Sequence, residues 1–311
     1  MGYTSILNIL KRLMKDSFSA VALVIVCLYF SFALFSEAYG LYCSKANQTP
    51  LYEKGSIENA NVPPSSSHWL GTDYKGRDVF WRAMHASRTA VKIGLFSSLL
   101  AVMIGVALGA AGGYFGGWID DFTVWIYSTF ASMPTLLFIL AFALLVTKGF
   151  LYPPLAEAFK NTAEFFNADP GMIAIYLGIG ITGWVGLCRV VRGEAMKLKS
   201  TAYIQAAKAL GYSPFKIIVR HLIPNLFHLI IIYFTIRFAY AIMTEVIVSY
   251  LGLGVQLEPS WGVMISDGQQ RLWQGVWWEV AGATAFMFFL VLSLHTLGDS
   301  LRDILDPRLK T

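Results

Sequence analysis

Charged residues are scarce in this sequence. Asp, Glu, Lys and Arg make up 14% of its 311 residues, whereas hydrophobic residues make up 56%. A soluble domain carries about 25% charged residues. This shortage excludes an ordinary soluble protein with one large core, and it predicts long segments that lie in a lipid bilayer.

Cysteine, histidine and the common catalytic motifs are also lacking. The three cysteines, Cys27, Cys43 and Cys188, lie far apart, so no disulfide framework or zinc site is predicted. The five histidines have no spacing typical of metal ligands. The patterns H-E-x-x-H, G-x-S-x-G and G-x-x-x-x-G-K-[ST] do not occur, and no basic patch interleaved with aromatics lies outside the apolar runs. We therefore expect this chain to have no catalytic residue and to bind no cofactor, metal or nucleic acid.

Long apolar runs are what the sequence has instead. Because helices satisfy their own backbone hydrogen bonds in lipid, such runs are expected to be transmembrane helices. The first follows Lys11, Arg12 and Lys15 as in a signal peptide, but it is too long for a cleavable one. The sequence therefore predicts an all-α membrane protein with six transmembrane helices. Their ranges are roughly 18–38, 91–115, 122–146, 172–191, 226–250 and 277–298.

Basic residues predict how these helices are oriented. Residues 189–224 contain seven Lys and Arg and a single acid, Glu194. Loops that face the cytoplasm carry an excess of Lys and Arg. We therefore expect 189–224 to be cytoplasmic and, because six is an even number, both termini to lie on the same side. The loop 39–90 is also basic, but it is long and contains acids.

Small residues recur every four positions in the second apolar run. This stripe predicts a helix face that lets another helix approach closely in lipid. The partner helix belongs either to the same chain or to a second subunit, and the sequence leaves both alternatives open. The stripe consists of Ser97, Ala101, Gly105, Gly109 and Gly113.

Two ionisable residues lie within the fifth apolar run. Arg237 is deep in it, and Glu245 lies two turns later near the outer end, where we expect water to reach it. Eight residues separate these side chains by about 80° around a helix, so they need not pair. Ionisable groups are costly inside a membrane and are candidates for function. We expect Arg237 to face a pathway, a partner helix or an acid elsewhere, and a structural role remains open.

Residues 203–225 predict two short helices joined by a tight turn. Ser200 or Thr201 is expected to cap the first helix, and Gly211 suits the left-handed residue after its end. Ser213 is expected to cap the second, with Pro214 in its first turn. The alanines of the first helix form a small, flat surface suited to insertion into a groove on another protein.

This segment resembles the EAA loop of binding-protein-dependent ABC importer permeases. The family pattern has Glu-Ala-Ala four residues before a glycine and ends in a hydrophobic-x-Pro sequence. In this chain Gln205 stands in place of the glutamate. The remaining matching positions are Ala206, Ala207, Gly211, Ile223 and Pro224. The resemblance implies that the loop is the coupling helix that docks on an ATPase subunit.

Further segments resemble the dipeptide and oligopeptide permeases, the DppC/OppC type. They are HWLGTDYKGRDVFWR (68–82), GYFGGWID (113–120), YLGLG (250–254) with Glu245 before it, PSWG (259–262) and LGDSLRDILDPR (297–308). The chain departs from the family early in the third helix, where Trp125 and Ser128 stand in place of a Met-Arg-x-x-Asp pattern. The outer loop 148–170 is also long.

HWLGTDYKGRD contains the residue types of a catalytic cluster, but nothing else in the chain completes one. Its tryptophans are typical of a membrane interface. Asp73 and Asp78 are expected to cap a helix or to pair with Lys75 and Arg77. We therefore interpret the segment as an interfacial elbow that orients the second helix.

The resemblance implies a permease subunit of the bacterial inner membrane, with a type I ABC importer bundle. The implied partners are a second homologous permease, two cytoplasmic ATPases that use ATP and Mg²⁺, an extracytoplasmic binding protein and a di- or oligopeptide substrate. Nickel chelates, glutathione and other small solutes remain alternatives, as does an ion-coupled secondary transporter. A membrane-embedded enzyme is not favoured. The expected organisation is residues 1–90 with the first helix and outer loop, 91–298 with the coupling loop 189–224, and a cytoplasmic tail, 299–311.

Overall fold

The computed structural model describes residues 11–147, 150, 154, 157–159, 161, 170–255 and 258–305. Every regular element within these ranges is a helix, which confirms the predicted all-α class. The longer ones are α2 (Ser17–Lys45), α3 (Val79–Phe115), α4 (Gly117–Ser132), α5 (Thr135–Thr147), α7 (Pro170–Gly183), α8 (Val185–Lys199), α9 (Ala202–Ala209), α11 (Ile223–Tyr250), α12 (Trp261–Gln269) and α13 (Trp278–Leu305). The short ones are η1 (Ile57–Asn59), α10 (Pro214–Ile217), η2 (Ile218–Leu222) and η3 (Leu272–Gln274).

Five helices in the described part of the chain are long and apolar enough to cross a membrane. They span Ser17–Lys45, Val79–Phe115, Gly171–Lys199, Pro214–Tyr250 and Trp278–Leu305. A sixth span is present if the bent pair formed by α4 and α5 is counted as one. The six predicted apolar runs therefore all lie on these helices.

The third predicted span is not one continuous helix. α4 and α5 meet at an angle of 86°. Met133, between them, has extended backbone angles of φ −83° and ψ 135°. A residue that precedes proline avoids the helical conformation, and Pro134 has no N–H to donate. The predicted span 122–146 therefore consists of two helices, because this proline interrupts it.

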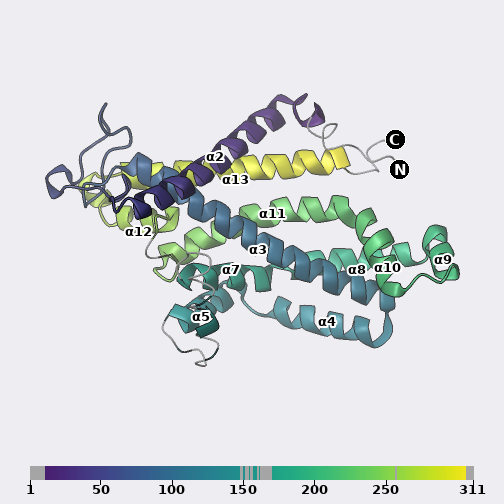
Figure 1. Cartoon of the computed structure of the whole chain (residues 1–311). Coiled ribbons are helices and arrows are strands. Elements are labelled where there is room, and N and C mark those ends of the chain that lie inside the picture. The colour runs from purple at the N-terminus through teal and green to yellow at the C-terminus, as the bar shows by residue number, and fades with distance from the viewer. Residues whose placement is uncertain are drawn as a thin grey trace.

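α3 is the central helix of the bundle and contacts α2, α4, α7, α8, α11 and α13 (Figure 1). It begins at Val79, directly after the segment HWLGTDYKGRD. The expected boundary after residue 90 therefore lies within one continuous helix, and the boundary after residue 298 lies within α13.

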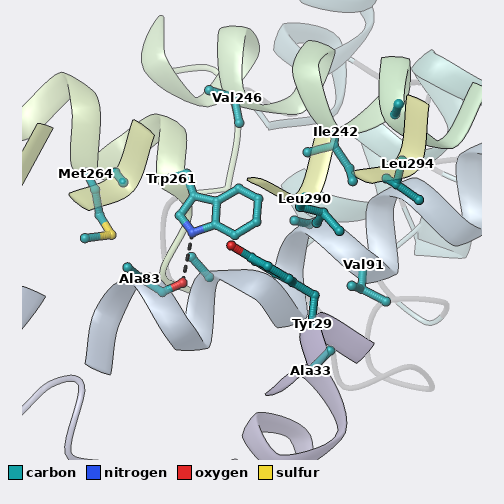
Figure 2. Close-up of a cluster of buried hydrophobic side chains, with 14 of the residues drawn as sticks. Tyr29, Ala33, Ala83, Val91, Ile242, Val246, Trp261, Met264, Leu290 and Leu294 are labelled. Atoms are coloured by element: carbon teal, nitrogen blue, oxygen red, sulfur yellow. Dashed lines mark hydrogen bonds between the residues drawn. The ribbon is translucent and has the colours of Figure 1, made fainter. Parts of the chain in front are cut away.

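The largest buried cluster joins α3 to α2, α11, α12 and α13. Trp261 of α12 is 1% exposed, and its indole N–H donates to the carbonyl of Ala83 in α3 at 2.9 Å (Figure 2). The ring of Tyr29 in α2 meets that indole edge to face, with centroids 6.1 Å apart. The Tyr29 hydroxyl donates to the carbonyl of Phe286 at 2.7 Å. Both polar groups are thus satisfied inside an apolar core.

α10, η2 and α11 form one continuous helix from Pro214 to Tyr250. η2 is a π-helical turn that ends at Leu222, two residues before Pro224. Because Pro224 has no N–H, the carbonyl of Arg220 loses its helical donor, and a wider turn accommodates this without ending the helix. The ribbon changes direction here, between α10 and α11 (Figure 1).

The two ends of the bundle are distinct. The start of α2 and the end of α13 meet at one end, where the hydroxyls of Ser19 and Ser300 lie 2.6 Å apart. α9 and α10 lie at this same end, and α12 lies at the opposite one (Figure 1). At the α12 end, the indole N–H of Trp278 donates to the carbonyl of Thr72 at 2.9 Å. That bond joins the loop before α3 to the start of α13.

Candidate functional site

The turn between α9 and α10 has the geometry that its sequence predicts. Gly211 has φ +77°, in the left-handed region. The Tyr212 N–H donates to the carbonyl of Ala207 at 3.1 Å, and the Gly211 N–H donates to that of Lys208 at 3.0 Å. This pair of bonds is a Schellman motif. Ser213 then caps α10 by accepting from the N–H of Lys216 at 3.4 Å.

The start of α9 is held differently from the prediction. Thr201 occupies the N-cap position, but its hydroxyl donates backwards to the carbonyl of Leu198 at 2.6 Å. The Ser200 hydroxyl likewise donates to the carbonyl of Lys197 at 2.8 Å. Neither side chain caps α9, because both hydroxyls are turned back towards the carbonyls at the end of α8, to which they donate. Gln205 joins them, since its side-chain amide donates to the carbonyl of Lys199 at 2.8 Å.

α9 has one buried face and one exposed face. Ile204 and Ala207 are buried, and they pack in a cluster with Ile217 and Leu222 and with residues of α3 and α8. The exposed face, called the α9–α10 face below, consists of Tyr203, Ala206, Leu210, Gly211 and Phe215. Leu210 and Phe215 are each 75% exposed. The alanine surface expected from the sequence is therefore divided, because Ala206 faces out and Ala207 faces the chain's own core.

The small-residue stripe of α3 packs against the main chain of α8. A Cβ atom at Gly105 would lie 2.9 Å from the carbonyl oxygen of Trp184. A Cβ at Gly109 would lie 2.6 Å from that of Cys188, and a Cβ at Gly113 would lie 2.5 Å from that of Arg192.

The other two stripe residues, Ser97 and Ala101, are buried as well, and Ala101 packs in a cluster with Trp184 and Cys188. The stripe therefore packs inside its own chain. It holds α8, which leads directly into α9, close against the central helix.

An ion pair also connects α4 to α8. Arg192 of α8 donates to both carboxylate oxygens of Asp120, with Nη2 and Oδ2 2.6 Å apart. Such bidentate pairing fixes orientation as well as distance. Nearby, the guanidinium of Arg189 lies 4.9 Å from the ring centroid of Tyr127 in α4. The helix that leads into α9 is thus held on two sides.

Glu245 lies at the α12 end of α11 and is 1% exposed. Its Oε1 accepts hydrogen bonds from the hydroxyls of Ser249 and Ser260, each at 2.6 Å. Ser260 is the N-cap of α12, so the carboxylate connects α11 to α12. The expectation that water reaches Glu245 is wrong, because the chain after α11 folds back over this end of the helix.

Arg237 lies near the middle of α11, away from Glu245. Its guanidinium lies 4.7 Å from the ring centroid of Tyr240, one turn later. The Glu245 carboxylate accepts its hydrogen bonds from two serine hydroxyls. Arg237 and Glu245 therefore do not form an ion pair, which agrees with their angular separation around the helix.

Asp73 is the centre of the segment HWLGTDYKGRD. It is fully buried and accepts from the main-chain N–H groups of Lys75 at 2.9 Å and Arg77 at 2.8 Å. Its other oxygen accepts from Nε of Arg77 at 2.7 Å and lies 3.4 Å from Nη1 of Arg82. A carboxylate with this many donors is a structural anchor rather than a free base.

Asp78, at the end of the same segment, caps α3. Its side chain accepts from the N–H of Trp81 at 3.2 Å, and its second oxygen lies 2.8 Å from Nδ1 of His68. The Trp69 side chain is 69% exposed, as expected for an interfacial residue. Together these contacts fold the segment into an elbow at the start of α3.

A cavity of about 220 Å³ lies beside this elbow. Burial raises the pKa of the Tyr52 phenol in its wall to about 12, so this group is neutral at physiological pH. In the part of the chain that the structure describes, no group of three or more His, Cys, Asp or Glu side chains is arranged to hold a metal. The cavity is lined by Tyr52, Glu53, Tyr74, Lys75, Arg77, Arg82, Glu258, Pro259, Val263 and Asp267.

Residues 101–311 match the family model of the binding-protein-dependent transport system inner membrane component. That stretch contains the α3–α8 seam, the α9–α10 turn and the whole of α11. The chain belongs to this permease family. It is therefore a multi-pass membrane permease rather than an enzyme.

The permease is similar to several transport proteins. It is 33% identical to the dipeptide transport system permease protein DppC of Bacillus subtilis, over 82% of this chain and 73% of the relative. It is 31% identical to the oligopeptide transport system permease protein OppC of the same organism, over 96% of this chain and 88% of the relative. It is 32% identical to the glutathione transport system permease protein GsiD of Pectobacterium atrosepticum, over 82% and 77%.

Proposed function

We propose that this permease imports di- or oligopeptides that an extracytoplasmic binding protein delivers. The observation that carries the proposal is the similarity to an oligopeptide permease over 96% of the chain. The glutathione permease among the relatives favours a second candidate, a small peptide-like thiol. All three relatives are named for substrates that are amino-acid derivatives with carboxylates.

The transport step requires partners. A second homologous permease would complete the path through the bilayer, and two cytoplasmic ATPase subunits would supply energy with ATP and Mg²⁺. This chain contains no phosphate-binding loop of its own. Its task is to couple the ATPases to the membrane helices.

We assign the docking of an ATPase to the α9–α10 face. Leu210 directly follows α9 and Phe215 lies in the first turn of the helix Pro214–Tyr250, and such exposed apolar side chains at a tight turn suit insertion into a groove. Ala206, Gly211 and Pro214 are exposed beside them. Ala207 and Ile223 pack in the apolar cluster behind this face, and Gln205 and Pro224 are exposed residues of the same loop.

The α9–α10 face is proposed to lie on the cytoplasmic side of the bacterial inner membrane, together with both termini. The support is the excess of basic residues in 189–224 and the position of the start of α2 and the end of α13 at this same end.

Coupling then follows from how the face is connected. Closure of the ATPases on ATP would move α9 and α10, and α10 is continuous with α11. α8, which precedes α9, is held to α3 by the glycine seam. ATP shifts the permease between inward- and outward-facing states only if the ATPases contact the face differently in the two states. Arg237 is proposed to face the path, and Glu245 is proposed to hold the helix that carries it.

One experiment tests the proposal. The permease is purified from its host membrane in mild detergent, and the proteins that come with it are identified. The proposal predicts a second permease and P-loop ATPases, with ATP hydrolysis that rises when binding protein loaded with a peptide is added. Uptake by this chain alone, driven by an ion gradient, would contradict it and support a secondary transporter.

A further inference from the structure

Arg237 is a cation in the membrane for which the described part of the chain supplies no carboxylate. Arg189, Arg220 and Arg302 on the long apolar helices are exposed, whereas the other buried or half-buried arginines of these helices each face a carboxylate. Arg82 lies 3.4 Å from Asp73, Arg88 lies 3.3 Å from Glu258, and Arg192 lies 2.6 Å from Asp120. Among the described residues, Arg237 forms no such ion pair, and its Nε is buried without a hydrogen-bond partner.

An unpaired guanidinium at this depth is costly. A charged side chain at the centre of a transmembrane helix is costly to insert and is usually paired or in contact with water. Arg237 lies near the middle of α11, so a position at the membrane surface does not relieve this cost. The charge therefore requires water or an anion from outside the described residues.

The surroundings of Arg237 are shaped to keep its guanidinium in place. A Cβ atom at Gly183, at the end of α7, would lie 2.3 Å from Nη2 of Arg237, so a larger residue there would force the guanidinium to move. Tyr240 stacks under the cation at 4.7 Å. The Tyr240 side chain is itself 45% exposed, so this side of α11 opens away from the chain's core.

We propose that Arg237, positioned by Gly183 and Tyr240, receives a carboxylate of the substrate as the substrate crosses the membrane. The inference rests on the proposed import of peptides. A guanidinium presents a planar pair of donors that matches a carboxylate. Every unmodified peptide carries a carboxylate at its C-terminus, so one arginine serves substrates with different side chains.

The test uses the complete transporter in proteoliposomes, with binding protein and ATP. The probes are trialanine and trialanine amide, each at a concentration that saturates the binding protein. The readout is the ratio of the two initial uptake rates, measured for wild type, Arg237→Lys and Arg237→Gln. Met243→Gln is the control, because it changes polarity at an exposed position of α11 nearly two turns from Arg237.

We expect wild type to prefer the free acid by about tenfold or more, as a charge-assisted hydrogen bond allows. Arg237→Lys is expected to retain part of this preference, Arg237→Gln to lose it and Met243→Gln to keep it. An unchanged preference in Arg237→Gln overturns the inference. Loss of the assembled complex in Arg237→Gln also overturns it, because the charge then pairs with a partner subunit. No peptide uptake in wild type contradicts the proposed function itself, whereas equal uptake of acid and amide contradicts only the role of Arg237.

Discussion

The side-chain amide of Gln205 donates a hydrogen bond of 2.8 Å to the main-chain carbonyl of Lys199. Lys199 is the last residue of α8, and carbonyls at a helix end lack a donor within the helix. Gln205 supplies that donor from the neighbouring helix α9. The resembled family has glutamate at this place, and an ionised carboxylate donates no hydrogen bond. The hydrogen bond to Lys199 thus explains why glutamine rather than glutamate suits this position in this chain.

Gln205→Glu is therefore expected to loosen the connection between α8 and α9. The lost bond is worth about 1 kcal/mol. We expect a lower thermal stability of the purified permease and weaker retention of the ATPases. Gln270→Glu is the control, because it makes the same change outside α9, at the opposite end of the bundle. Equal effects of the two substitutions would show that the Gln205 contact has no special role.

Gly211→Asp is expected to impair ATPase docking more than folding. Gly211 has φ +77°, and a Cβ atom added there would meet no other atom within 4 Å. The fold therefore loses only the cost of a left-handed residue, about 1 kcal/mol. The new carboxylate would stand on the α9–α10 face beside Leu210. The measurement is the amount of ATPase that co-purifies with the permease.

Gly275→Asp is the matched control for that experiment. Gly275 has φ +82° and equally open surroundings, but it lies in the loop before α13. Gly275→Asp should keep its ATPases. Normal assembly and transport in Gly211→Asp would refute the docking role of the α9–α10 face.

Gly109→Val is expected to separate α3 from α8. The Cβ of the added side chain would lie 2.6 Å from the carbonyl oxygen of Cys188, which is too close for either atom to stay in place. Overpacking of this kind costs about 1–3 kcal/mol. Ala107→Val changes volume on the exposed side of the same helix and should be tolerated. Thermal unfolding in detergent compares the two, and equal stability would contradict the tight α3–α8 seam.

Asp73→Asn is expected to destabilise the elbow before α3. It removes the charge that faces Arg77 and Arg82, and breaking a buried ion pair costs about 3 kcal/mol or more. Limited proteolysis of residues 50–80 is the measurement, with the exposed Glu58→Gln as control. Unchanged protection in Asp73→Asn would show that the main-chain donors alone hold the turn.

Local features of this chain were predictable from its sequence. Gly211 and Pro214 predict the turn between α9 and α10, because only a few residues suit a left-handed position or the first turn of a helix. Long apolar runs predict the membrane helices in the same way. The bend between α4 and α5 was also readable in principle, since Pro134 lies inside the run.

Contacts between distant residues were not predictable in this way. The burial of Glu245 depends on Ser260, fifteen residues later in the chain, and on how α12 folds back. The pair of Arg192 and Asp120 joins residues 72 positions apart. Likewise, α10 is too short for its periodicity to show that Phe215 faces outwards. These contacts and exposures depend on tertiary packing, which cannot be derived from the local pattern of a single sequence.

The helix α11, which runs unbroken from Ile223 to Tyr250, makes the permease a mechanical lever. Its 28 residues span about 42 Å at 1.5 Å per residue. A tilt of about 5° around one end would displace the other by about 4 Å. Arg237 lies near the middle of this lever and would travel about half as far, while Glu245 would carry the motion to α12. A small movement at the α9–α10 face thus reaches the far side of the membrane enlarged, without any helix having to unfold.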